Sequence, residues 1–161
     1  MSCIEKIVDI DKYLLQKSQG LYMGKKVVFT NGCFDILHSG HVLYLEEAKS
    51  LGDILVLGLN SDNSVKRIKG NDRPICSEHE RAIVLSGLSF VDKIIIFEED
   101  TPYDLINKIQ PDVLVKGGDW AVEKIIGFDI VLMKGGEVRS LIFKEGISTS
   151  GIVKKILEKK N

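Results

Sequence analysis

Residues 25–41 read KKVVFTNGCFDILHSGH and combine a buried strand, a glycine-containing turn and the start of a helix. The apolar run within 25–30 predicts the strand, and the periodicity of apolar residues predicts a helix over 41–50. A strand, a turn and a helix in this order are typical of a parallel α/β sheet, in which the turn lies at the carboxyl end of the strand.

The rest of the chain alternates between apolar runs and helical patterns. We expect further strands at 53–60, 93–97, 112–118, 130–133 and 137–143. We expect helices at 78–90, 102–109, 122–126 and 148–159, and a polar loop at 61–73. Strands rich in Val, Ile and Leu between helices predict an α/β fold with a doubly wound, mostly parallel, Rossmann-like sheet and helices on both faces. We assign residues 1–24 to an N-terminal helical extension and residues 25–161 to one domain.

The composition excludes several classes of protein. The 161 residues carry 22 Lys and Arg against 23 Asp and Glu, a balance that argues against a nucleic-acid-binding protein. We expect no membrane segment and no secretion signal, and therefore a cytoplasmic location. The three cysteines are far apart, so they predict neither a disulfide framework nor a paired-cysteine metal site.

Two of the three histidines lie at the start of the first predicted helix. His38 and His41 are one helical turn apart, where free backbone N–H groups and the helix dipole favour an anion. Zinc would need more ligands, and the only other histidine, His79, has no suitable spacing. Rings satisfied by local hydrogen bonds are the alternative interpretation. Gly32, which allows close approach to a ligand, and Gly40, which relieves crowding beside the histidines, favour a phosphate site.

The decapeptide GCFDILHSGH at 32–41 resembles the HxGH motif of the cytidylyltransferase-like nucleotidyltransferases. The resemblance implies that a substrate phosphate attacks the α-phosphorus of a nucleoside triphosphate, while the two histidines stabilise charge in the transition state. Such a reaction requires alignment and charge stabilisation rather than an activated nucleophile. The implied nucleotide-binding residues here are Asn31, Gly32, Cys33, Phe34, Asp35, Gly40 and His41.

The segment EGISTSGIVKK at 145–155 resembles the second motif of the same superfamily, GIST. We therefore expect Ser148, Thr149 and Ser150 to bind nucleotide, although simple capping of the last helix is the alternative. Related cytidylyltransferases have an arginine at the position of Phe143, and we expect Lys144 to replace it in part.

Basic residues in the middle of the chain complete the predicted site. Lys69 is the expected catalytic lysine, with Lys66 as the alternative, in a loop that we expect to close on phosphate. Arg81 matches an arginine of the family and is expected to bind nucleotide. We expect KGGDW at 116–120 to provide Gly118, Asp119 and Trp120 on the base and ribose side. Residues expected on the substrate phosphate are Lys66, Arg67 and Lys116.

At a finer level the chain resembles the adenylyltransferase domain of heptose-phosphate pathways, here in a stand-alone form, and residues 25–161 are then a nucleotidyltransferase domain. The segments VKRIKGNDRP, PDVLVKGGDW and GGEVRSLIF are the basis of this resemblance. It implies ATP and D-glycero-D-manno-heptose 1-phosphate as substrates, with Mg²⁺ held mainly by the triphosphate and no identified protein ligand. A homodimer is possible. The alternatives are a glycerol-3-phosphate or ethanolamine-phosphate cytidylyltransferase and a non-catalytic nucleotide-binding module.

Overall fold

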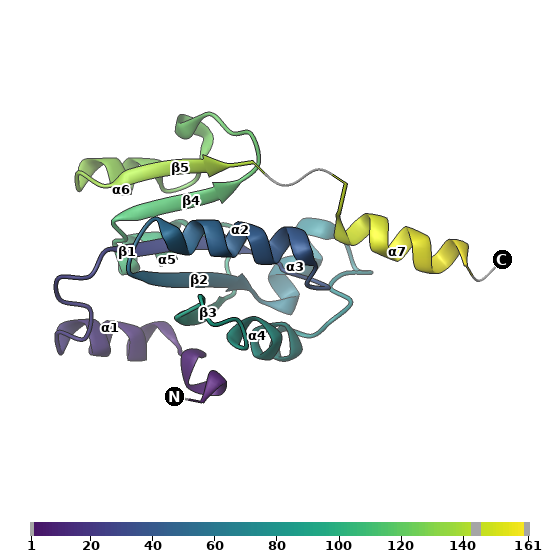
Figure 1. Cartoon of the computed structure of the whole chain (residues 1–161), viewed down its shortest axis with the longest axis horizontal. Helices are drawn as coiled ribbons and strands as arrows, with labels where there is room; N and C mark the ends of the chain where they lie inside the picture. Colours follow the sequence, from purple (N-terminus) through teal and green to yellow (C-terminus); the bar gives the residue numbers. More distant parts are fainter. Residues whose placement is uncertain (1, 143–145, 160–161) are drawn as a thin grey trace.

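The structure is a computed structural model that describes residues 2–142 and 146–159. Five parallel strands form one sheet in the order β3-β2-β1-β4-β5. Their bounds are β1 Val27–Gly32, β2 Ile54–Asn60, β3 Lys93–Phe97, β4 Val113–Gly117 and β5 Glu137–Leu141. The doubly wound α/β fold expected from the sequence is confirmed (Figure 1).

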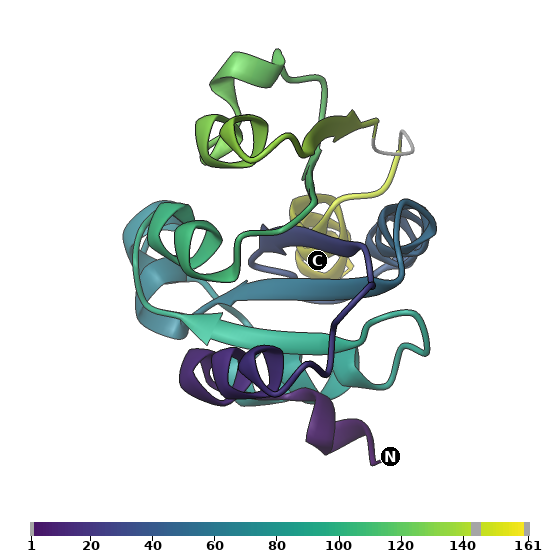
Figure 2. The same ribbon diagram turned by 90° about the vertical axis from the view of Figure 1, so that its left-hand side faces the viewer.

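Helices cover both faces of this sheet. Their bounds are α1 Ile10–Ser18, α2 Ser39–Ser50, α3 Asp62–Lys69, α4 Glu78–Ser86, α5 Tyr103–Ile109, α6 Phe128–Met133 and α7 Thr149–Glu158, with short 3-10 helices at Cys3–Lys6 and Val122–Lys124. Apolar residues of α1, α5 and α6 pack in one core cluster, and those of α2 and α4 pack in a second. Figure 2 shows α2 and α5 on opposite sides of the sheet.

Two sequence predictions were wrong. The predicted loop at 61–73 contains α3, because Ser61 caps a helix by accepting the N–H of Ser64 and Val65 is buried. The predicted strand at 130–133 lies inside α6. A short apolar run does not distinguish a strand from a buried helix, and here Ile130 and Val131 contact the core while Met133 is exposed.

Residues before β1 contribute to the core. Tyr13 of α1 is fully buried and stacks on Tyr22, with 5.1 Å between ring centroids. Ile7 forms an isolated parallel bridge with Ile94 of β3, and the N–H of Val8 donates to the carbonyl of Ile94 over 3.0 Å. The proposed domain boundary at residue 24 stays a prediction.

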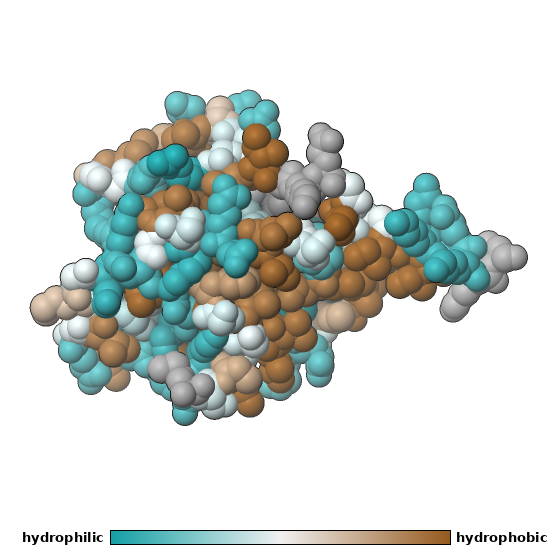
Figure 3. Space-filling model, viewed as in Figure 1, coloured by the Kyte–Doolittle hydropathy of each residue, from teal (hydrophilic) through white to brown (hydrophobic). Residues whose placement is uncertain are grey.

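The last helix, α7, extends away from the sheet (Figure 1). It has no buried residue, and Ile156 and Leu157 are 56% and 60% exposed. Figure 3 shows apolar surface along this helix. The predicted contributions of Phe143 and Lys144 lie outside the described residues.

Candidate active site

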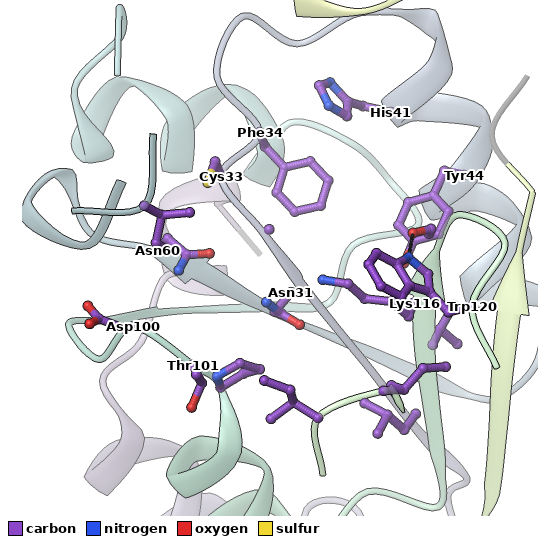
Figure 4. A pocket seen from close by; sticks show the side chains of 18 of the residues that line it. Asn31, Cys33, Phe34, His41, Tyr44, Asn60, Asp100, Thr101, Lys116 and Trp120 are labelled. Atoms are coloured by element: carbon purple, nitrogen blue, oxygen red, sulfur yellow. Dashed lines mark hydrogen bonds between the residues drawn. The ribbon is translucent and has the colours of Figure 1, made fainter. Parts of the chain in front are cut away.

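A cavity of about 540 Å³ opens at the carboxyl ends of β1, β2 and β4. This edge is where doubly wound sheets bind ligands. His41 and the pair Asp100–Thr101 lie at opposite ends of the cavity, and Lys116 and Trp120 lie beside its centre (Figure 4). The residues predicted from sequence that line the cavity are Asn31, Gly32, Cys33, Phe34, Asp35, His41, Lys69, Lys116, Trp120 and Thr149.

The turn after β1 has an unusual backbone. Phe34 and Ile36 have φ of 46° and 54°, in the left-handed backbone region that residues other than glycine rarely adopt. Gly32 allows this geometry, since a Cβ there would lie 2.8 Å from Cε2 of Phe34. The Phe34 ring then meets the His41 ring edge to face, at a centroid distance of 5.2 Å. The turn therefore holds one wall of the cavity against the start of α2.

His38 and His41 form a stacked pair at the N-terminus of α2. Their ring centroids are 3.8 Å apart with an interplanar angle of 22°. Gly40 makes room for the pair, because a Cβ there would lie 3.1 Å from the His38 ring. Both Nδ1 atoms are buried and, within the described residues, have no hydrogen-bond partner.

Both imidazoles have lowered pKa values. Burial lowers the pKa of His38. Burial lowers the pKa of His41 to about 4, and the charges of His38 and Lys69 contribute to the shift. The rings are therefore neutral near pH 7, and each has one N–H that can donate to an anion.

Asp35, in the turn after β1, forms hydrogen bonds with the segment at 73–76 and with the start of α7. Its buried carboxylate accepts from Arg73 Nε over 2.7 Å and from the N–H groups of Ile75 and Cys76 over 2.8 and 2.9 Å. Burial opposes ionisation, but these N–H groups and the guanidinium outweigh it and hold the pKa of Asp35 below its ordinary value. The carbonyl of Asp35 accepts from Thr149 Oγ1 over 2.7 Å, so the two motifs from opposite ends of the sequence meet here.

The three predicted residues of the second motif, Ser148, Thr149 and Ser150, lie in different surroundings. Only Thr149 of the three predicted residues lines the large cavity. Ser148 caps α7 by accepting the N–H of Gly151 over 3.1 Å, which is the capping role considered as the alternative. Ser150 lies at a separate, shallow cavity with Arg73.

The basic residues of α3 point in different directions. Lys69 lines the cavity, whereas Lys66 is exposed and does not. Arg67 forms ion pairs with Asp100 and Glu98, at 2.6 and 3.5 Å, and ties α3 to the loop after β3. This geometry favours Lys69 over Lys66 as the lysine that contacts phosphate.

Arg81 is buried and fully engaged by the protein. Its guanidinium donates to the carbonyls of Cys33, Asn60 and Cys76 over 2.6, 2.9 and 3.0 Å, and to Asp62 Oδ1 over 2.8 Å. Arg81 therefore positions the strand ends that form the cavity, and its predicted contact with nucleotide stays a prediction.

Three residues of KGGDW, namely Lys116, Gly117 and Trp120, line another part of the cavity. Trp120 is 48% exposed and donates its Nε1–H to the carbonyl of Gly117 over 3.0 Å. Gly118 has φ of 113°, and a Cβ there would lie 2.7 Å from Trp120 Nε1. Gly118 and Asp119 are not among the residues that line the cavity.

Comparison with known proteins identifies the family. The sequence profile of the cytidylyltransferase-like family matches residues 29–155. The chain belongs to the cytidylyltransferase-like family. It is 57% identical over 158 residues to the bifunctional protein HldE of Campylobacter concisus, covering 98% of this chain and 32% of that protein. It is 50% identical over 159 residues to the protein of the same name from Campylobacter jejuni, covering 96% of this chain and 34% of that protein.

The chain thus spans about a third of the length of these curated relatives. A crystal structure of the lipopolysaccharide core biosynthesis protein from Thermoplasma volcanium is also similar to this cytidylyltransferase-like chain. The TM-score is 0.62 at 30% identity, and the match covers 77% of this chain and all of that one.

Several cavity residues of this cytidylyltransferase-like chain were missed from sequence. Asn60, Asp100 and Thr101 line the cavity, and all three follow or end a parallel strand. The rule that strand ends meet at one edge could have found them. Tyr44 also lines the cavity, and its hydroxyl lies 2.5 Å from Thr30 Oγ1.

The described residues of this cytidylyltransferase-like chain contain no group of three or more His, Cys, Asp or Glu side chains that could hold a metal ion. No helix between residues 2 and 142 or between 146 and 159 has the length and apolarity needed to cross a bilayer.

Proposed function

We propose that the chain is a nucleotidyltransferase that transfers AMP from ATP to D-glycero-D-manno-heptose 1-phosphate, giving ADP-heptose and pyrophosphate for the lipopolysaccharide inner core. The observation that carries the proposal is the stacked, neutral pair of His38 and His41 at the N-terminus of α2. His41 lines a cavity that also contains Lys69 and Thr149, and His38 stacks on His41 without being part of the lining. Neutral donors, a cation and a helix N-terminus together are suited to a polyphosphate.

The reaction itself needs no group on the protein to attack. An oxygen of the acceptor phosphate attacks the α-phosphorus of ATP, a new P–O bond forms, and the bond to the bridging oxygen of the β-phosphate breaks. Negative charge grows on the departing pyrophosphate, where the N–H groups of His38 and His41, the Lys69 ammonium and the first turn of α2 would stabilise it. The protein contributes alignment and fixed positive potential, as expected when the nucleophile is already a phosphate dianion.

The identity of the acceptor is supported by the relatives. The segments at 65–74 and 111–120 resemble heptose-phosphate adenylyltransferase domains, and the similar structure from Thermoplasma volcanium is described as a lipopolysaccharide core biosynthesis protein. The hydroxyl of Thr101 and the second carboxylate oxygen of Asp100, whose Oδ1 is paired with Arg67, are suited to sugar hydroxyls rather than to phosphate.

The test measures pyrophosphate release with ATP, CTP and GTP, each combined with heptose 1-phosphate, glycerol 3-phosphate and ethanolamine phosphate. We expect turnover with ATP and heptose 1-phosphate. Turnover confined to CTP and glycerol 3-phosphate would overturn the acceptor assignment, and no turnover with any pair would favour a non-catalytic nucleotide-binding module.

We also propose that Mg²⁺ enters with the triphosphate, whose oxygens are the hard ligands that this ion prefers. The ion would supply charge neutralisation on the phosphates, while the residues named above hold the polyphosphate. EDTA should abolish turnover, and added Mg²⁺ should restore it. Since ATP is made in the cytoplasm, we place the reaction there.

A homodimer is the oligomeric state that we propose, because the exposed Ile156 and Leu157 on α7 offer an apolar surface for a second copy. Light scattering after size-exclusion chromatography tests this assignment. A monomer at micromolar concentration would contradict it.

A further inference from the structure

Lys116 is the last side chain of β4 before the paired glycines, and it projects into the cavity. Figure 4 shows its ammonium reaching toward Asn31, with Trp120 beside it. The residue is partly buried and belongs to the cavity lining. A lysine in this position places a positive charge, partly shielded from bulk water, inside the cavity.

No carboxylate of the described residues lies within 4.0 Å of this ammonium, and it makes no hydrogen bond to them. Two sheltered arginines of the described residues have partners, Asp35 for Arg73 and Asp62 for Arg81, whereas Lys93 is buried without an ion pair among those residues, but it does not line the cavity. Burial lowers the pKa of Lys116; an electrostatic interaction with Cys33 opposes this effect, and the charge of Lys69 adds to it. An unpaired, partly desolvated ammonium is costly unless an anionic ligand compensates it.

The sheet places Lys116 and Lys69 on different sides of β1. Lys69 ends α3, which follows β2, whereas Lys116 ends β4, and β2 and β4 flank β1. Lys69 is close enough to His41 to lower its pKa, but Lys116 does not contribute to that shift. Lys69 also adds to the lowering of the Lys116 pKa, so the two lysines are within electrostatic reach of each other. It is the strand order that puts Lys116, on β4, across β1 from Lys69 at the end of α3.

Positive charges on both sides of β1, from Lys69 and Lys116, match the demands of an in-line displacement, and Lys124 adds a third lysine to the cavity lining. The acceptor phosphate must attack the α-phosphorus from the side opposite to the one on which the pyrophosphate departs, and both groups are anionic. We propose that Lys116 binds the phosphate of the acceptor and directs its attacking oxygen at the α-phosphorus, while His38, His41 and Lys69 hold the pyrophosphate end. This inference rests on the proposed function and assigns the acceptor-phosphate subsite within it. Lys116 keeps its protons throughout, since the attacking oxygen is already anionic.

The test compares Lys116→Met, which preserves the length of the side chain without its charge, with Lys116→Arg. Loss of one charged hydrogen bond should raise the KM for the acceptor by about 10- to 150-fold, with the KM for ATP changed less than about 3-fold. Lys116→Arg should recover part of this loss. The matched control is Lys108→Met, an exposed lysine on α5 that does not line the cavity.

A binding measurement separates this inference from the proposed reaction. Trp120 is the only tryptophan, and it lies beside Lys116, so its fluorescence should report occupancy of the cavity. ATP should titrate Lys116→Met as it titrates the unaltered protein, whereas heptose 1-phosphate should bind the variant at least about 10-fold more weakly.

The outcomes are distinct. Equal weakening of ATP and acceptor in Lys116→Met, or an unchanged affinity for the acceptor, would refute the acceptor-phosphate subsite. If the unaltered protein releases no pyrophosphate with any acceptor, the proposed function fails, and the fluorescence titration still decides whether Lys116 binds a sugar phosphate.

Discussion

Replacing His41 with alanine removes one of the two stacked rings at the N-terminus of α2. Because the neutral ring offers an N–H where charge grows on the departing pyrophosphate, we expect the loss to fall on kcat. Removal of one such donor in other enzymes costs about 100- to 1,000-fold, so we expect kcat to fall by that factor. The KM for ATP should change only a few-fold, since the ground-state triphosphate keeps Lys69, Thr149 and the helix N-terminus.

The geometry also predicts how the effects of the two histidine substitutions on turnover combine in the double variant. Independent losses in His38→Ala and His41→Ala would multiply to about 10⁴- to 10⁶-fold in the double variant. The rings stack at 3.8 Å, so either deletion leaves the other ring unsupported and free to tilt. The double variant should therefore lose about 10³- to 10⁴-fold, which is well short of the product.

Initial rates of pyrophosphate release with saturating ATP and heptose 1-phosphate measure both effects. His79→Ala is the matched control, because His79 is exposed on α4 and lies outside the cavity lining. Thermal unfolding must show that each variant is folded. Rates within about 3-fold of the unaltered protein in folded His38→Ala and His41→Ala would refute this account of the histidine pair.

Three further perturbations test the surroundings of the pair. Asp35→Asn leaves the Arg73 guanidinium poorly compensated and should lower the free energy of unfolding in urea by about 2–4 kcal/mol, whereas Asp104→Asn, on the exposed side of α5, should leave it nearly unchanged. In Gly40→Ala the new Cβ would lie 3.1 Å from the His38 ring, so turnover should fall at least about 10-fold while the melting temperature holds; unchanged turnover would contradict the crowding argument. The depressed pKa of His41 disfavours the protonated ring in the folded state, so stability should decline as the pH falls from 6.5 toward 4. The loss between pH 7.5 and 5 should reach about 2 kcal/mol at most, and His41→Asn should remove it; urea unfolding at both pH values measures the difference.

The positions of the strands could be read from sequence, because most of them are short apolar runs bounded by turn residues, whereas their order in the sheet was not predicted. The two errors arose where local pattern is weak. The segment at 62–69 is mostly polar; Val65 is its one buried apolar residue, and this residue and the Ser61 cap are weak signals for a helix. The segment at 130–133 is too short for its apolar residues to distinguish a period of two from a period of 3.6.

Some features of the candidate site could likewise be predicted from sequence, whereas others could not. His38, His41 and Thr149 were predicted from the two motifs, and the structure places His41 and Thr149 in one cavity lining with His38 stacked on His41. The role of Arg81 depends on four acceptors, three of them backbone carbonyls from separate segments, and no local pattern encodes that arrangement. The pairing of Arg73 with Asp35 joins residues 38 positions apart, so only the folded chain reveals it.

The bridge between Ile7 and Ile94 has a consequence for association. β3 is an edge strand of the sheet, and an edge strand presents unpaired N–H and C=O groups that recruit strands from other molecules. The Ile7 bridge and the Val8 N–H cover part of that row, and the packed Tyr13 holds the covering segment in place. The residues before β1 therefore act as a guard against edge-to-edge aggregation as well as part of the core.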